Sequence, residues 1–430
     1  MAARGTERFC ALCALATLHR FADGGPRVRY LHQVAVGASR IFREAFLLGP
    51  GNPCAVHYKT RGKGCLPWDF APERLERYLA LRDLTDPDQG LHAINILMND
   101  LIAAVARWSG LPADIVRRPP VVPITDNYDR LSYEPDAIAR SARYSHYIDD
   151  IHMLRTHTTA GIPPLLAETR SDRLIVCPGL VYRRDVVDRL HVGEPHQVDL
   201  WIARQGRLRR AHLLEMIAAI VETVLPGQAY RCNETIHPYT MNGLEVEVRI
   251  GERWVEVLEC GEIHPWLLND SNLPSQKWSG LAMGVGLDRL IMLIKQIDDI
   301  RLLRSSDPRI ARQMLTLARY EAVSNQPATH RDLSICVGDP DMELLGDRIR
   351  NVLGERSGWV ENVELLQASD YASVPEKARE RLSMSPSQHN LLVRVTLRSL
   401  DGSISKEDAN RLYDLVYSEL HEGTSGYFRN

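Results

Sequence analysis

Apolar residues recur at helical spacing in two segments of the chain. In residues 90–108 and again in residues 210–225 they fall at intervals of three and four, the pattern of a helix with one apolar face. Gly110 followed by Pro112 ends the first segment, and a Pro-Gly pair ends the second. We therefore predict two helices, and we expect both to pack into a core rather than to form binding surfaces.

Strict alternation of apolar and charged residues predicts a β-hairpin in the middle of the chain. Residues 244–250 alternate in this way, a Gly-Glu pair provides a turn, and the alternation resumes at residues 254–258. This register places Glu247 opposite Glu256, and like charges directly opposite each other are unfavourable. Two interpretations remain open: a solvated polar face, or a pair of carboxylates covered by a cation such as Mg²⁺.

The last hundred residues have the pattern of a small separate module. It follows a Ser-Asn-Gln-Pro segment that ends at residue 327 and is typical of a linker. The pattern predicts, in order, a strand, a helix, two strands and a helix, at about residues 333–337, from 342, 359–366, 390–397 and 406–420. This order is typical of a split βαβ, ferredoxin-like fold.

Size and charge narrow the class of protein. A length of 430 residues predicts two or three domains. No apolar run approaches the roughly 18 residues that span a bilayer, so we expect no membrane partner. The net charge of −3 gives no general attraction to nucleic acid, so any RNA contact must depend on local basic patches.

The cysteines are scattered, which favours a reducing compartment, and we expect a cytoplasmic protein. The arginine-rich first 29 residues leave an organelle-targeting segment as an alternative. Cys10, Cys13, Cys54 and Cys65 are candidate zinc ligands, but the second pair lacks the spacing of a zinc knuckle. Buried or free thiols are the other interpretation.

Four motifs, in order and at compatible spacing, resemble the catalytic core of phenylalanyl-tRNA synthetases, most closely the one-chain mitochondrial type. They are Asn-Tyr-Asp-Arg-Leu at 127–131, His-Met-Leu-Arg-Thr-His-Thr-Thr at 152–159, Val-Tyr-Arg-Arg-Asp at 181–185 with His-Gln-Val-Asp at 196–199, and Gly-Val-Gly-Leu-Asp-Arg at 284–289. The tail from about residue 327 resembles the anticodon-binding domain of the same family.

The resemblance implies an α+β fold: a class II synthetase antiparallel sheet flanked by helices, plus a C-terminal ferredoxin-like α+β domain. The domains would be residues 1–85 of unknown role, a catalytic core at 86–320 and an anticodon-binding domain at 327–430. The implied activity is an aminoacyl-tRNA ligase whose partners are an amino acid, ATP with Mg²⁺, and tRNA. The oligomeric state, monomer or homodimer, stays open.

The chemistry of such an enzyme calls for arginine. The amino-acid carboxylate attacks the α-phosphorus of ATP and needs no strong base, so catalysis consists of positioning and charge stabilisation. Arginine remains charged and pairs with phosphate or carboxylate oxygens through two N–H groups. The resemblance assigns the ATP side of the site to Arg183, Asp185, His191, Gly286 and Arg289, with Mg²⁺ held by Glu256 and by Glu247.

The same resemblance assigns the amino-acid side. Gln197 and Asp199 would receive the substrate ammonium. The other residues expected to line this part of the site are His157, Thr159, His237, Tyr239, Cys260 and Gly261.

The chain departs from the family at the pocket for the side chain. His237-Pro238-Tyr239 replaces Phe-Pro-Phe, Glu259 replaces a small residue, and Pro195 replaces a phenylalanine that stacks on adenine. One interpretation keeps phenylalanine as the substrate. The other is a more polar amino acid, since sites built to hydrogen-bond a substrate can reject its apolar analogue by about 10⁴–10⁵. A paralogue that activates a non-standard amino acid for biosynthesis, and a non-catalytic RNA-binding paralogue, are further alternatives.

Overall fold

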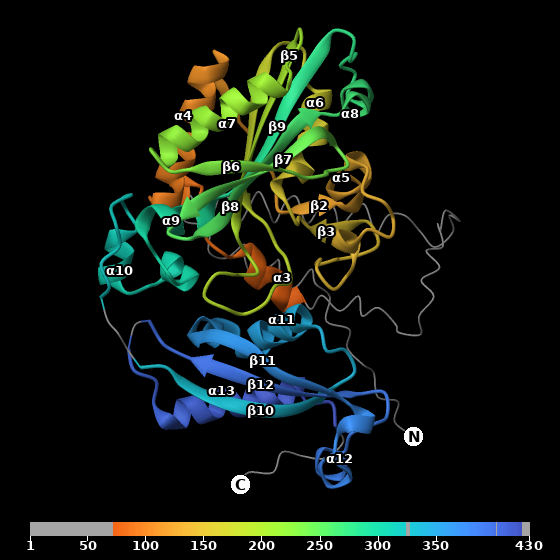
Figure 1. Ribbon diagram of the computed structural model, residues 1–430, viewed down its shortest axis with the longest axis vertical. Helices are drawn as coiled ribbons and strands as arrows, with labels where there is room; N and C mark the ends of the chain where they lie inside the picture. Colours follow the sequence, from red (N-terminus) through yellow and green to blue (C-terminus); the bar gives the residue numbers. More distant parts are fainter. Residues whose placement is uncertain (1–71, 324–326, 401, 424–430) are drawn as a thin grey trace, which may run out of the picture. The chain divides into compact units, whose positions relative to one another are not determined.

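The computed structural model describes residues 72–323, 327–400 and 402–423 (Figure 1). The four candidate zinc cysteines and the arginine-rich N-terminal segment lie outside these residues. No helix in the described part of the chain combines the length and the apolar character needed to cross a membrane.

A seven-stranded sheet forms the centre of the larger part of the structure. Its neighbouring strands are antiparallel except for β1 and β4, which are parallel. In spatial order the strands are β1 (Ala113–Ile115), β4 (Arg173–Leu180), β5 (His196–Gln205), β9 (Trp278–Gly286), β8 (Arg253–Ile263), β7 (Thr240–Ile250) and β6 (Tyr230–Glu234).

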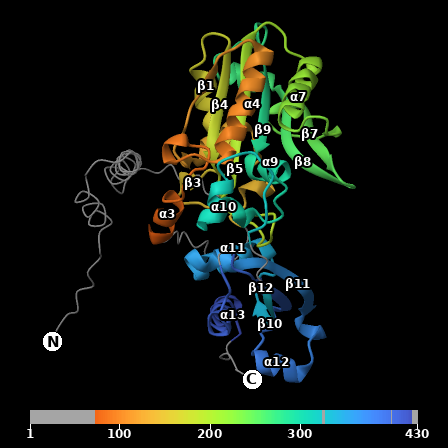
Figure 2. The ribbon, with the colours of Figure 1, turned by 90° about the vertical axis from the view of Figure 1, so that its left-hand side faces the viewer.

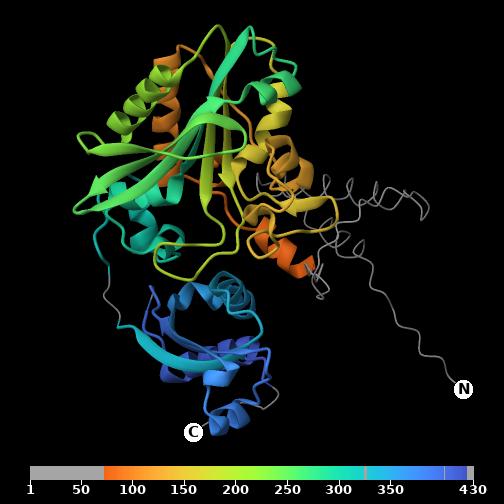
Figure 3. The same ribbon diagram turned by 45° about the vertical axis from the view of Figure 1, so that its right-hand side comes forward.

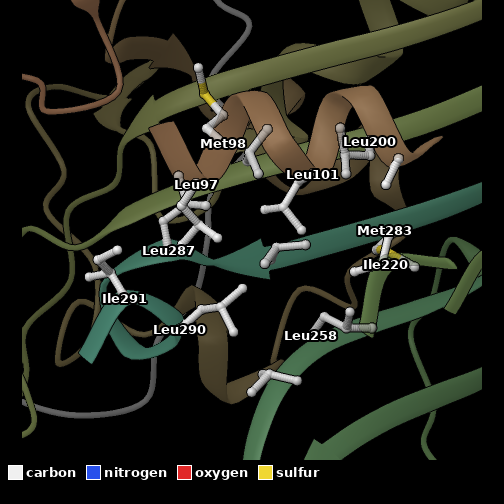
Figure 4. Close-up of a cluster of buried hydrophobic side chains, with 14 of the residues drawn as sticks. Leu97, Met98, Leu101, Leu200, Ile220, Leu258, Met283, Leu287, Leu290 and Ile291 are labelled. Atoms are coloured by element: carbon white, nitrogen blue, oxygen red, sulfur yellow. The ribbon is translucent and has the colours of Figure 1, made fainter. Parts of the chain in front are cut away.

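The two helices predicted from periodicity cover one face of this sheet, as Figure 2 shows for α4 (Ala93–Ser109) and α7 (Arg210–Val224). Together with α9 (Leu287–Lys295), they bury the main apolar core, part of which is drawn in Figure 4. Gly110 ends α4 in the left-handed conformation (φ 70°), which glycine adopts without steric cost. The prediction that both helices serve the core is confirmed.

Shorter elements lie around the sheet, and several of them cover its other face (Figure 3). Two short strands, β2 (Val121–Pro123) and β3 (His152–Leu154), pair with each other. The short helices are α3 (Pro72–Leu79), α5 (Ile124–Asn127), α6 (Ile162–Ala167), α8 (Pro265–Asp270) and α10 (Pro308–Gln313). An antiparallel sheet with helices on its faces confirms the predicted α+β class.

The predicted hairpin is formed by β7 and β8, and Glu247 pairs with Glu256 as expected. The register shifts beside this pair, because Val246 is opposite Leu258 and Val257 has no partner on β7. Val257 and Leu258 are therefore both buried in the main core, and this β-bulge resets the alternation. As a result Glu256 and Glu259, three residues apart, influence each other electrostatically on the face away from the core.

The C-terminal residues form the predicted strands and helices, with one further helix, α12, that was not predicted. They are β10 (Thr329–Val337), α11 (Met342–Leu353), β11 (Val360–Asp370), α12 (Glu376–Leu382), β12 (His389–Leu397) and α13 (Lys406–Leu420). The strands form an antiparallel sheet in the order β10-β12-β11, and α11 and α13 pack on it around one apolar cluster. A ferredoxin-like module has four strands and the described residues supply three, so that assignment stays a prediction.

Candidate active site

Alternation along the central strands separates the core from a candidate site. On β5, Val198 and Leu200 belong to the main core, whereas Asp199 between them lies outside that cluster. Asp199 is directly opposite Gly284 on β9, and Gly284 is directly opposite Glu259 on β8. Residues opposite each other in antiparallel strands share a face. The three therefore line up across the sheet, with a glycine between two carboxylates.

A pocket of about 290 Å³ lies over this line of residues. Part of this space is open to solvent. The pocket is lined by Thr159, Gln197, Asp199, Trp201, His237, Tyr239, Thr240, Glu259, Cys260, Ala282, Met283 and Gly284. The structure thus brings together most of the residues predicted for amino-acid binding.

Cys260 and Gly261 differ from the expectation. Cys260 lines the pocket, but its side chain belongs to the main core, where burial raises the pKa of the thiol to about 12. Gly261 is not among the lining residues. A Cβ at this position would lie 2.7 Å from Cβ of Thr240, so the glycine allows close approach of β7 and β8.

Asp199 is the most deeply buried charged group of the pocket. Its carboxylate accepts hydrogen bonds from Oγ1 of Thr158 (2.5 Å), Oγ1 of Thr159 (2.9 Å) and Nε1 of Trp201 (2.8 Å). Burial raises its pKa to about 6, although these hydrogen bonds act in the opposite direction. All three donors are neutral, so they orient the carboxylate without cancelling its charge. A bound ammonium group would offset the negative charge of Asp199.

Gln197 lies beside this carboxylate. Its Oε1 accepts a hydrogen bond from the backbone N–H of Thr158 (3.3 Å), and a Cβ at Gly284 would lie 3.1 Å from its Nε2. Glycine at position 284 therefore leaves room for the amide.

Stacked rings form another wall of the pocket. Tyr239 stacks with Trp201 (centroids 5.8 Å apart) and with His237 (5.7 Å), and Tyr133 lies 6.3 Å from Tyr239. Trp201 and Tyr133 were missed in the sequence. Strand alternation could have identified Trp201, two residues after Asp199, whereas no pattern points to Tyr133.

His157 is placed behind these rings rather than in the lining. Its ring stacks on Tyr133 at 5.8 Å. Burial, assisted by the charge of Arg183, lowers its pKa to about 3, so the imidazole is neutral. This neutral ring packs on Tyr133 and is not among the residues that line the pocket.

Glu259 and His237 lie within hydrogen-bond distance inside the pocket, with 3.1 Å between Nε2 of His237 and Oε2 of Glu259. This contact holds the pKa of Glu259 below its usual value, so the carboxyl is ionised near neutral pH. The resembling family has a small residue at this position, whereas this chain has the charged Glu259.

The arginines of the predicted ATP side lie on the same face. Arg289 Nη1 is 3.6 Å from Oε2 of Glu256, and Nε of Arg183 donates to the backbone oxygen of Thr156 (2.7 Å). The charge of Arg183 also acts on Glu256 and Glu259, so its guanidinium lies near both carboxylates.

His191 and Asp185 lie on the loop between β4 and β5. Nδ1 of His191 is 2.8 Å from Asp188, and this hydrogen bond raises the pKa of the imidazole. The charges of Asp185 and Arg289 also act on His191, which places these predicted ATP residues near one another. At Gly286 an added Cβ would meet nothing within 4 Å, so the space beside this residue is open.

Glu247 is occupied by other partners. Its Oε2 accepts hydrogen bonds from Nε of Arg231 and Nδ2 of Asn233, both at 2.6 Å. Arg231 at Glu247 and Arg289 at Glu256 supply the positive charge expected over this pair. In the described ranges no three His, Cys, Asp or Glu side chains converge as a metal site. The prediction that Glu247 holds Mg²⁺ therefore has no support in this geometry.

The sequence of the chain is similar to those of known proteins. The sequence family described as "tRNA synthetases class II core domain (F)" matches residues 89–314. The phenylalanine--tRNA ligase alpha subunit of Prochlorococcus marinus (strain MIT 9313) is 33% identical over 233 residues, which are 54% of this chain and 69% of that protein. The corresponding subunit of Acaryochloris marina (strain MBIC 11017) is 31% identical over 53% of this chain and 68% of its own length.

Among solved structures, a pyrrolysyl-tRNA synthetase from Desulfitobacterium hafniense gives a TM-score of 0.40 at 17% identity. It covers 54% of this chain and 78% of its own. At that level of identity the similarity gives no information on the substrate.

Proposed function

The chain belongs to the class II tRNA synthetase core family, and we propose that it activates an amino acid with ATP and transfers it to tRNA. The observation that carries this proposal is the arrangement on one face of the sheet. A buried carboxylate without a cationic hydrogen-bond donor, Asp199, lies on the same face as Arg183 and Arg289.

The first step joins the α-carboxylate of the amino acid to the α-phosphorus of ATP. A carboxylate oxygen forms the new P–O bond, and the bond to pyrophosphate breaks. In this proposal Arg183 holds the substrate carboxylate and the α-phosphate, since its charge acts on carboxylates at both parts of the site, Glu256 and Glu259. Arg289 lies against adenine and the γ-phosphate, while Asp185 meets the adenine amino group and His191 meets phosphate.

The amino end of the substrate is held by Asp199, Gln197 and Thr159. The ammonium donates to the Asp199 carboxylate, whose present donors are all neutral. Binding the ammonium there turns the α-carboxylate towards Arg183. Such positioning supplies much of the barrier reduction in reactions between two bound substrates.

Glu256 is the residue that fits Mg²⁺. Its side chain is 44% exposed beside Arg289, and nearby Glu259 and Glu245 add negative charge that a cation would offset. One carboxylate plus substrate phosphates is a common Mg²⁺ arrangement. When bound, the ion neutralises charge on the phosphates.

The tail at 327–430 is proposed to contact tRNA. The RNA would be recognised through exposed bases and phosphates, with a marked salt dependence. The non-catalytic alternative is disfavoured by the presence of Arg183, Arg289, Gln197 and Glu256 on one face.

The test is ATP–pyrophosphate exchange with a panel of amino acids, with and without tRNA. We expect exchange with at least one aromatic amino acid, phenylalanine or a more polar one. Absence of exchange with every amino acid, in both conditions, would contradict the proposed function.

A further inference from the structure

Two carboxylates face each other across a glycine on the floor of the pocket. Asp199, Gly284 and Glu259 are in register on β5, β9 and β8. Adjacent strands are about 4.8 Å apart, so the backbones that carry the two carboxylates are separated by roughly 10 Å. Gly284 has no side chain to divide this space. A substrate whose ammonium binds Asp199 therefore extends over Gly284 towards Glu259.

Glu259 has more acceptor capacity than its protein partner uses. Nδ1 of His237 is 3.4 Å from Oγ1 of Thr240, which leaves Nε2–H to donate to Glu259. A carboxylate offers about four lone-pair positions. The Glu259 side chain is 45% exposed in the open pocket, so water satisfies the remaining positions until a ligand displaces it.

The walls around this carboxylate favour a planar ligand. Tyr239 stacks with both Trp201 and His237, and flat aromatic faces pack well against another ring. Burial raises the pKa of Tyr239 well above its usual value, so the phenol stays neutral and does not compensate the charge of Glu259.

We propose that the pocket selects an aromatic amino acid that carries an N–H or O–H donor on its ring, and that Glu259 determines this specificity. His237 is the positioning residue that orients Glu259. This inference rests on the proposed function. A phenyl ring would strip water from an ionised carboxylate and return no hydrogen bond, which is costly. A ring that carries an N–H or O–H donor replaces the hydrogen bond that the displaced water had donated to Glu259.

The experiment compares ATP–pyrophosphate exchange by the full chain for phenylalanine, tyrosine and 4-aminophenylalanine. The wild-type protein should give a higher kcat/KM with a donor-bearing substrate than with phenylalanine. In Glu259→Ala the ratio of donor-bearing substrate to phenylalanine should fall about 10- to 100-fold, the loss expected for one hydrogen bond to a charged group. Glu259→Gln keeps the shape, removes the charge and should lower the ratio less.

A matched control is available on the same strand. Glu262 on β8 accepts a hydrogen bond from Asn242 (2.8 Å) and does not line the pocket, so Glu262→Gln should leave the ratio unchanged. Retained or increased exchange with phenylalanine in Glu259→Ala shows that the variant is folded, and with a fallen ratio it supports the proposal.

Two results would overturn the inference. Preference of the wild type for phenylalanine, with the ratio unmoved in both Glu259 variants, would show that Glu259 points away from the substrate, while the proposed function would stand. Absence of exchange with every amino acid in the wild type would remove the proposed function, and this inference with it.

Discussion

The Asp199 carboxylate shows how a single residue sets the behaviour of the pocket. Burial raises its pKa to about 6, and its hydrogen bonds from Thr158, Thr159 and Trp201 hold it in place. Only the ionised form can accept an ammonium as an ion pair. Substrate capture should therefore depend on pH in a range where most carboxylates no longer titrate.

We predict that kcat/KM for the amino acid falls as pH decreases through about 6, by about tenfold per pH unit below that value. The sign follows from the raised pKa, because protonation below it removes the charge that binds the ammonium. The pH profile of pyrophosphate exchange measures this. Asp199→Asn should lower kcat/KM and flatten this limb, whereas an unchanged profile in that variant would assign the titration to another group.

Arg183 should have the largest effect of any single residue on the activation step. Arg183→Ala is predicted to lower the exchange rate by about 10²–10³, by analogy with the loss of one charge-stabilising donor. The matched control is Arg204→Ala on β5, because Arg204 pairs with Asp172 and does not line the pocket. Equal rates in the two variants would show that Arg183 does not contact the reacting groups.

Strand alternation in the sequence was enough to predict the Glu247–Glu256 pair, but not its partners. Arg231 reaches Glu247 from β6, a strand with no clear signal of its own. Tyr133 packs against Tyr239 from a loop, with the ring centroids 6.3 Å apart. Such contacts depend on tertiary placement, which local periodicity does not encode.

At the scale of elements, two glycines in neighbouring strands serve different purposes. A Cβ at Gly261 would lie 2.7 Å from Thr240, whereas one at Gly286 would meet nothing within 4 Å. The first glycine therefore serves strand packing. Gly286 leaves open space at the point where β9 ends and α9 begins.

We predict that Gly261→Ala destabilises the fold by about 1–3 kcal/mol, the usual cost of overpacking a well-packed region. Gly286→Ala should leave the free energy of unfolding unchanged and instead raise the KM for ATP. Denaturant unfolding and exchange kinetics of both variants separate these effects. A destabilised Gly286→Ala variant with normal ATP kinetics would contradict the assignment of that space to the nucleotide.

At the scale of the whole molecule, the tail contacts the loop that carries Asp185. Nη1 of Arg350 on α11 donates to the backbone oxygen of Asp185 (2.6 Å), and the backbone N–H of Val363 donates to the backbone oxygen of Val187 (2.8 Å). The sequence predicted the tail's elements in order except for the short helix α12, because each of the others has its own periodicity. It did not predict this contact, because backbone acceptors are present at every residue.

Deletion of residues 327–430 is predicted to leave amino-acid activation measurable, at a reduced rate, and to abolish most transfer to tRNA. The activation rate should fall because the deletion removes the tail's hydrogen bonds to residues 185–187. Transfer should be lost because the deletion removes the proposed RNA contact. Exchange and tRNA charging are measured on the same truncated protein, after cooperative unfolding has shown that it is folded. Equal loss of both steps would mean that the tail is not a separate RNA module.

The most direct test of the central claim follows the fate of the α-phosphate of ATP. The protein is incubated with Mg²⁺, ATP labelled at the α-phosphate, and the amino acids that support exchange, and the products are separated. Attack on the α-phosphorus predicts label in an aminoacyl-adenylate, with release of unlabelled pyrophosphate, and formation of that product about 10²–10³-fold more slowly with Arg183→Ala. Label that appears instead in ADP would show transfer of the γ-phosphoryl group and would contradict the account.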